Sequence, residues 1–168
     1  TLEGNPFTQF IFQIFIFCAI LIIGYTCNFY YLAFLSSRRK DLNPIIEVGE
    51  PTITIQLPIY NERYVATRLV DAVCQQDYPK DKMKIMVLDD SDDDTVATMS
   101  NTVKKYQSLG FDIEHVRRGT RNGYKAGALK HAMKSTTSEF VAIFDADFIP
   151  PTWYLKKAIP HFTKSNIG

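Results

Sequence analysis

Apolar residues are distributed in two different ways along this chain of 168 residues. Between Phe7 and Leu35 no residue is charged, and phenylalanine, isoleucine, leucine and tyrosine make up most of the segment. Beyond about residue 50, short apolar runs alternate with segments in which apolar residues recur every three or four positions. The first pattern is typical of a helix in lipid, and the second of a domain in which strands and helices alternate.

The uncharged segment predicts a transmembrane anchor within residues 1–40. A helix needs about 20 apolar residues to cross the bilayer core, and this segment is longer. The basic run Arg38-Arg39-Lys40 follows it, whereas the preceding side offers only Glu3, so the positive-inside rule predicts a cytoplasmic location for the residues after the helix. A cleaved signal peptide would have a shorter apolar core with positive charge before it, and buried soluble helices are rarely apolar on every face.

Residues 41–50 lack sustained periodicity and are predicted to form a linker, with a domain boundary near residue 50. Residues 51–168 are predicted to form an α/β domain with a mainly parallel sheet. Strands are expected at 52–57, 84–88, 111–116 and 140–144, and the last of them is expected to be a buried, central strand. A helix is expected after each strand, and the third of these helices is expected at Tyr124–Met133. The expected inward faces of these helices are Val65, Leu69 and Val73; Val96, Met99, Val103 and Tyr106; Leu129, Ala132 and Met133; and Leu155, Ile159 and Phe162.

Local signals suggest where these elements begin and end. Pro58 is expected to end the first strand, and Asn61 to cap the helix that follows it. Ser91 and Asp94 have the spacing of a capping box, and Gly110 is expected to stop the second helix of the domain.

Composition excludes several classes of protein. The formal net charge of +1 provides no basic field for nucleic acid. The three cysteines and three histidines lack the spacing of a disulfide framework or a zinc site. A dinucleotide-binding glycine motif after the first strand and a P-loop are both missing, so these two ways of binding phosphate are disfavoured.

Polar residues follow three of the predicted strands, as Tyr60-Asn61-Glu62, Asp89-Asp90 and Asp145-Ala146-Asp147. In parallel sheets of this kind ligands bind at the carboxyl ends of the strands. In extended chain Asp145 and Asp147 point to the same side, where a divalent cation would relieve their repulsion. The alternative interpretation is that they cap a helix whose start is predicted by Pro150 and Pro151. Three acidic or polar strand ends together favour a ligand site.

The segment from Arg121 to Gly127 would provide donors for an anion. Gly123 and Gly127 allow close approach of the backbone, and Lys125 lies near a helix start, where amides and the helix dipole favour negative charge. The alternative is a surface loop with ordinary charges. Combined with the acidic strand ends, the segment predicts a nucleotide diphosphate bound through a metal.

Four motifs carry a family resemblance: Leu57-Pro58-Ile59-Tyr60-Asn61-Glu62, Val87-Leu88-Asp89-Asp90-Ser91, the run from Arg121 to Leu129, and Phe144-Asp145-Ala146-Asp147. In this order they resemble the processive family 2 glycosyltransferases, above all the cellulose-synthase-like group that includes glucomannan and xyloglucan-backbone synthases. The resemblance covers about residues 51–168. It implies a GT-A fold and transfer of a hexose, with inversion, from a nucleotide-diphosphate sugar to a growing polysaccharide or glycolipid acceptor.

The resemblance also implies roles for the matched residues. Asp145 and Asp147 would hold Mg²⁺ or Mn²⁺, and Asp89 and Asp90 would approach the base and ribose. Lys125 would face the diphosphate or the donor sugar. The complete set of implied nucleotide-sugar contacts is Pro58, Tyr60, Asn61, Glu62, Asp89, Asp90, Arg121, Asn122, Lys125 and Asp145. The motifs do not distinguish UDP-hexose from GDP-hexose as the donor.

The sequence departs from the family pattern after the fourth motif. The catalytic-base motif, the acceptor motif and the later membrane helices of the family do not occur in these 168 residues. We therefore expect an N-terminal fragment whose general base lies beyond Gly168. A membrane-tethered nucleotide-sugar-binding module without catalysis and a lipid-phosphate sugar transferase are the alternative functions.

Overall fold

The computed structural model describes residues 4–38 and 49–162. The chain divides into two compact units, Thr1–Pro44 and Ile45–Gly168, and each is described by itself. The first contains α1 (Pro6–Arg38), a helix of 33 residues with no buried residue. It is long and apolar enough to cross a membrane, with a mean hydropathy of 2.4 in its most apolar window. Most of the expected linker, residues 41–48, lies outside the described residues.

The second unit is built on a four-stranded parallel sheet in the order β3-β2-β1-β4. Its strands are β1 (Ile53–Ile59), β2 (Met83–Asp89), β3 (Asp112–Val116) and β4 (Phe140–Ile143). The helices are α2 (Arg63–Cys74), α3 (Thr95–Ser108), α4 (Tyr124–Met133) and α5 (Tyr154–Phe162), with the short 3₁₀ helix η2 (Lys80–Lys82) before β2. The predicted parallel α/β architecture is confirmed, as is the predicted range of α4.

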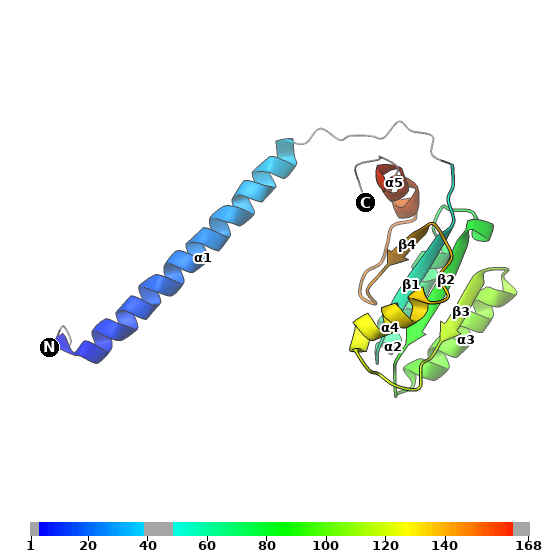
Figure 1. Cartoon of the computed structure of the whole chain (residues 1–168), viewed down its shortest axis with the longest axis horizontal. Helices are drawn as coiled ribbons and strands as arrows, with labels where there is room; N and C mark the ends of the chain where they lie inside the picture. The colour runs from blue at the N-terminus through cyan, green and yellow to red at the C-terminus, as the bar shows by residue number, and fades with distance from the viewer. Residues whose placement is uncertain (1–3, 39–48, 163–168) are drawn as a thin grey trace. The chain divides into compact units, whose positions relative to one another are not determined.

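Helices cover both faces of this sheet (Figure 1). On one face the strands pack against α2, α3 and α5 through the main apolar core, to which Leu57, Leu69 and Met99 contribute fully buried side chains. On the other face a smaller cluster joins Met86 and Leu88 of β2 to Ala128 and Ala132 of α4. Alternation of side chains along β2 supplies both clusters, since successive residues of a strand point to opposite faces. The carboxyl ends of β1, β2 and β3 therefore lie between two helical layers.

The first strand continues through Pro58 to Ile59, so the prediction that Pro58 ends it is wrong. The carbonyl of Gln56 accepts a hydrogen bond from Phe144 on the β4 side, and that of Ile59 accepts one from Asp90 on the β2 side. Because backbone groups alternate between the two sides, Pro58 faces the β4 side, where the strand pairing ends at Gln56. A proline is tolerated there because no ladder donor is needed.

The predicted caps of α2 and α3 are also wrong. The residue at the N-cap of α2 is Glu62, and that of α3 is Asp94, and neither side chain makes a capping hydrogen bond. The amide of Thr95 instead donates a hydrogen bond to the side chain of Asp93. Asn61 and Ser91 do not cap these helices, because their hydrogen bonds join the loop before α2 to the loop before α3. The end of α3 matches expectation, since Gly110 follows it with a φ of 81°.

The fourth strand differs from the expected buried central strand, because it is the edge strand of the described sheet. Its residue Ile143 is 48% exposed, and an apolar groove of about 230 Å³ runs between β4 and α5. Two residues expected on inward helix faces, Met133 and Phe162, are about half exposed at 51% and 52%. A short apolar run does not distinguish a strand covered on both faces from one at an edge.

Candidate functional site

Two loops at the carboxyl end of the sheet are joined by direct hydrogen bonds. The amide of Asn61, after β1, donates to Ser91 Oγ over 2.9 Å. The side chain of Asn61 donates to Asp92 Oδ1 over 2.8 Å and accepts from the Asp92 amide over 3.1 Å. Asn61 adopts a φ of 54°, a region that asparagine tolerates better than most residues. The role of Asn61 is therefore to connect the β1–α2 and β2–α3 loops.

Asp89 lies behind these loops rather than on their surface. Its side chain is fully buried, lies 2.8 Å from Nε2 of His115, and accepts a hydrogen bond from the Ser91 amide over 2.9 Å. Burial alone would raise the pKa of Asp89, but the hydrogen bonds from His115 and Ser91 outweigh it and lower that pKa below its usual value. In this arrangement Asp89 supports the loop and is not accessible to a ligand.

The next residue, Asp90, forms a two-pronged ion pair with Arg118, which follows β3. Arg118 Nε lies 2.8 Å from Asp90 Oδ1, and Arg118 Nη2 lies 2.5 Å from Asp90 Oδ2. The Asp90 side chain is only 7% exposed, but it lines a pocket at the end of the sheet. Paired geometry of this kind fixes the orientation of a carboxylate.

This pocket, of about 110 Å³, brings together side chains from three motifs of the sequence. Its lining consists of Pro58, Ile59, Tyr60, Glu62, Leu88, Asp90, Arg121, Lys125 and Ala128. The guanidinium carbon of Arg121 lies 3.3 Å from the centre of the Tyr60 ring and 5.0 Å from that of Tyr124. Six of the ten implied nucleotide-sugar contacts therefore face one hollow with cationic, acidic and aromatic groups.

Carboxylates and one ammonium gather beside this pocket. Asp145 and Asp147 follow β4 in a turn, and Lys125 Nζ forms an ion pair with Asp145 Oδ1. Burial raises the pKa of Glu62, and the negative charges of Asp147 and Asp145 raise it further, while Lys125 opposes them. Glu62, Asp145 and Asp147 therefore bring negative charge to this point, and Lys125 offsets part of it.

The donor chemistry of Asp145 and Asp147 fits a hard divalent cation, which prefers carboxylate oxygens. Within the described residues there is no group of three or more potential ligands close enough to enclose a metal ion. Mg²⁺ in nucleotide sites is commonly held by one or two carboxylates together with phosphate oxygens, so a complete protein cage is not required. The residues present therefore fit a metal shared with a phosphorylated ligand. The helix-capping alternative finds no support among the described hydrogen bonds, since α5 begins only at Tyr154.

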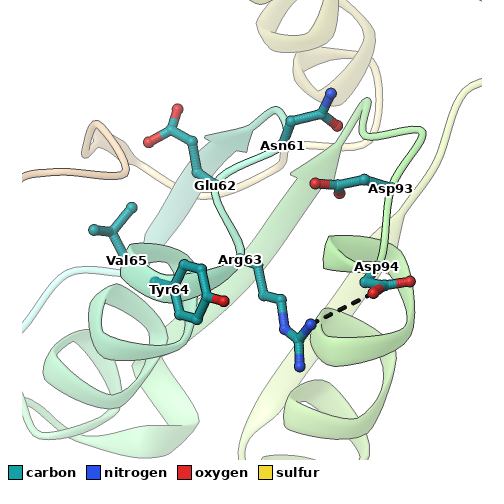
Figure 2. Close-up of a pocket in the computed structure, with 7 residues that line it drawn as sticks. All are labelled: Asn61, Glu62, Arg63, Tyr64, Val65, Asp93 and Asp94. Carbon is teal, nitrogen blue, oxygen red and sulfur yellow. Dashed lines mark hydrogen bonds and ion pairs between the residues drawn. The ribbon is translucent and has the colours of Figure 1, made fainter.

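A second, larger hollow of about 520 Å³ lies between the start of α2 and the loop before α3 (Figure 2). Glu62 contributes to both hollows, and Arg63 reaches across this one to Asp94 over 3.4 Å. The side chain of Arg63 is about half exposed, and that of Asp94 is largely exposed. We regard the smaller hollow as the site, because it holds the buried Asp90 and the cations that a phosphorylated ligand needs.

Three residues that organise the site were not predicted from sequence. His115 and Arg118 hold the two aspartates after β2, and Arg117 donates to the Ser91 carbonyl over 2.7 Å. The position of Arg117 and Arg118 could have indicated their role. Both immediately follow a predicted strand, so they reach the same edge of the sheet as the acidic residues. Asn122, by contrast, contributes its carbonyl to Arg118 and is not among the pocket-lining residues.

Comparison with known proteins shows the family to which the chain is similar. The profile described as glycosyl transferase family 2 matches residues 54–167. "Probable glucomannan 4-beta-mannosyltransferase 10" of Arabidopsis thaliana is 43% identical over 130 residues, which are 73% of this chain and 24% of the relative. "Glucomannan 4-beta-mannosyltransferase 9" of the same plant is 41% identical over 134 residues, 74% of this chain and 25% of the relative. The chain thus spans about a quarter of the length of these relatives.

Solved structures share the fold. The mannosyltransferase PcManGT from Pyrobaculum calidifontis, in complex with GDP-Man and Mn²⁺, superposes with a TM-score of 0.71 at 28% identity, over 87% of this chain and 42% of that one. S. aureus TarS 1–349 in complex with UDP-GlcNAc gives a TM-score of 0.58 at 26% identity, over 66% of this chain and 31% of that one. The chain belongs to glycosyl transferase family 2 and has the GT-A type of fold.

Proposed function

We propose that this chain is the donor-binding part of a membrane-bound glycosyltransferase that transfers mannose from GDP-mannose to a growing glucomannan, with inversion. The observation that carries the proposal is the single hollow lined by Asp90, Arg121, Lys125 and Tyr60, next to Asp145. The choice of mannose is supported by relatives at 41–43% identity that are named glucomannan 4-beta-mannosyltransferases. It is also supported by the neighbouring structure that contains GDP-Man.

The hollow suggests how the donor is distributed over the site. A space of about 110 Å³ is smaller than the roughly 300 Å³ at the lower end of ligand pockets, so it would enclose only part of a nucleotide sugar. We assign the base to the Asp90 end, where a fixed carboxylate accepts hydrogen bonds. The diphosphate is assigned to Arg121 and Lys125, at the start of α4, where cations and helix amides favour anions.

Asp145 and Asp147 would hold Mg²⁺ or Mn²⁺ through their carboxylate oxygens. Such a cation offsets the negative charge that develops on a leaving diphosphate. Lys125, already paired with Asp145, supplies positive charge to the same place. Residues 1–40 are proposed as the membrane anchor and residues 51–168 as part of the GT-A domain on the cytoplasmic side. The group that deprotonates the acceptor is not assigned to this chain.

The test is titration calorimetry on the detergent-solubilised full chain with GDP-mannose and with UDP-glucose, each with and without Mn²⁺. We expect metal-dependent binding of GDP-mannose, and we expect Asp147→Ala to abolish the dependence on metal because one of two ligand carboxylates is lost. Asp81→Ala is the matched control, since Asp81 is an exposed carboxylate before β2, at the opposite end of the sheet.

Three outcomes would count against the proposal. Unchanged metal dependence in Asp147→Ala would reject the metal site. Preference for UDP-glucose would reject mannose as the sugar donor. Absence of GDP-mannose binding in the presence of Mn²⁺ would reject the donor site itself.

A further inference from the structure

Arg118 uses four of the five N–H donors of its guanidinium group on protein atoms from two different loops. Besides the two hydrogen bonds to Asp90, its Nη1 donates to the carbonyl of Asn122 and its Nη2 to the carbonyl of Tyr124, each over 2.7 Å. The side chain is only 11% exposed. One planar cation therefore joins the β2–α3 loop to the turn that begins α4. A lysine has a single charged nitrogen and does not reproduce this fork.

On the side of β2, Arg118 orients the acceptors of Asp90. A carboxylate has about four lone-pair positions, and Arg118 takes one on each oxygen of Asp90. Because Asp90 also lines the hollow, the remaining lone pairs are held in one orientation towards it. Two adjacent acceptors of this kind match two adjacent N–H donors on the edge of a guanine base.

On the side of α4, Arg118 closes the turn that carries the cations of the site. Its two carbonyl partners flank Gly123, which has a φ of 73° and precedes Lys125 by two residues. The turn is packed so closely that a side chain at Gly127 would overlap the Asn122 carbonyl and approach Arg118 Nη1 to 2.5 Å. The position of Lys125 is therefore linked to that of Asp90 through Arg118.

We propose that Arg118 is a positioning residue for donor binding, which holds the base-side acceptor Asp90 and the phosphate-side cation Lys125 in one fixed arrangement. The inference rests on the function proposed above, because it takes the hollow to be the site of a nucleoside diphosphate. Arg118 acts through its neighbours and does not itself touch the nucleotide.

The experiment compares Arg118→Lys with the wild type in binding GDP and guanosine, using the detergent-solubilised full chain with Mn²⁺. Loss of the fork is expected to weaken guanosine binding about tenfold, because the Asp90 end of the site is lost. GDP binding is expected to weaken about a hundredfold, because the contribution of Lys125 is lost as well. Arg68→Lys is the matched control: Arg68 is exposed on α2, outside the site, and its replacement is expected to change neither affinity. The melting temperature without ligand is recorded for each variant.

A second pair of variants separates positioning from a merely structural role. In the wild-type background Lys125→Gln is expected to weaken GDP binding about tenfold and to leave guanosine binding unchanged, because guanosine has no diphosphate. In the Arg118→Lys background the same change is expected to have little further effect on GDP. The effects of the two substitutions on GDP affinity are expected to be non-additive in this way only if Arg118 holds Lys125 in position.

The outcomes distinguish failure of this inference from failure of the proposed function. If the wild type does not bind GDP at all, the proposed function fails. If the wild type binds GDP but Arg118→Lys binds both ligands within twofold, the positioning role is rejected. A full effect of Lys125→Gln in both backgrounds would also reject it, as would a loss of affinity explained entirely by unfolding in the melting data.

Discussion

Among single residues, Gly127 has very little space around it, and it lies beside the candidate site. It lies within α4, where a side chain would collide with the Asn122 carbonyl and with Arg118. From the sequence, Gly127 was expected to allow close approach of a ligand. In the structure the close neighbours of Gly127 are parts of the protein itself, so its first role is to let the turn before α4 close.

We expect Gly127→Ala to destabilise the domain by about 1–3 kcal/mol, the usual cost of forcing extra volume into a packed region. Gly119→Ala is the control, because a Cβ at Gly119 meets no atom within 4 Å. That change is expected to stay within about 0.5 kcal/mol. Urea unfolding of the two variants in detergent, followed by fluorescence of Trp153, measures the difference. Equal midpoints would show that the turn yields to the added methyl group.

The sequence indicated which residues come close together, but it did not indicate which of them form hydrogen bonds or ion pairs with one another. Asp89 and Asp90 are neighbours in sequence, yet one is enclosed with His115 and the other lines the hollow with Arg118. Side chains alternate along a strand, so two adjacent aspartates at its end take opposite directions. Which direction leads to a ligand depends on the helices that cover each face, and these are set by the tertiary structure.

Individual helices and strands were predicted well in type and less well at their ends. The range of α4 was anticipated because apolar periodicity, a preceding glycine and a following polar stretch agree there. The ends of β1, α2 and α3 were not anticipated, because Pro58, Asn61 and Ser91 have partners in other segments or face an unpaired side of the sheet. Sequence signals for the end of a strand or helix are therefore overridden where the residue contacts another segment.

The connection from β4 to α5 is held by a side chain that follows the end of α2. Gln76 is 6% exposed, donates to the Pro151 carbonyl over 2.8 Å and accepts from the Leu155 amide over 3.3 Å. The Asp77 amide donates to the Thr152 carbonyl over 2.8 Å beside it. These contacts fix the far end of the segment that carries Asp145.

We expect Gln76→Ala to destabilise the domain by about 1–3 kcal/mol, because the buried Leu155 amide loses its hydrogen-bond partner. Hydrogen exchange should accelerate in α5 more than in α4, which Gln76 does not contact. The control is Gln75→Ala, since Gln75 is exposed one residue earlier and its side chain is expected to be replaceable. Unaltered exchange in α5 would show that the apolar contacts of Leu155 and Ile159 are sufficient to hold it.

At the scale of the whole molecule, the chain combines a helix long enough to span a membrane with a GT-A domain of family 2. The two are separate compact units. The charge distribution around α1, with Arg38-Arg39-Lys40 at one end and Glu3 at the other, is the basis for our proposal that the domain faces the cytoplasm.

We expect protease added to sealed microsomes that contain the full chain to digest the domain without detergent. The reason is that positively charged flanks are retained on the cytoplasmic side. A lumenal marker protein in the same vesicles should stay intact, and alkaline carbonate should not release the chain, because α1 buries about 20 or more apolar residues in lipid. Protection of the domain until detergent is added would reverse the proposed orientation.

The sequence by itself was sufficient for the architecture and the family, and it predicted the edge of the sheet where the candidate site lies. These features follow from periodicity, from the length of apolar segments and from the rule that polar strand ends of a parallel sheet meet at one edge. Only the tertiary structure decided that Asp89 is enclosed, that Arg118 holds Asp90, and that β4 is an edge strand of the described sheet. The physical reason is that hydrogen-bond partners and burial depend on segments far apart in the chain, such as residues 90 and 118, whose approach no local pattern specifies.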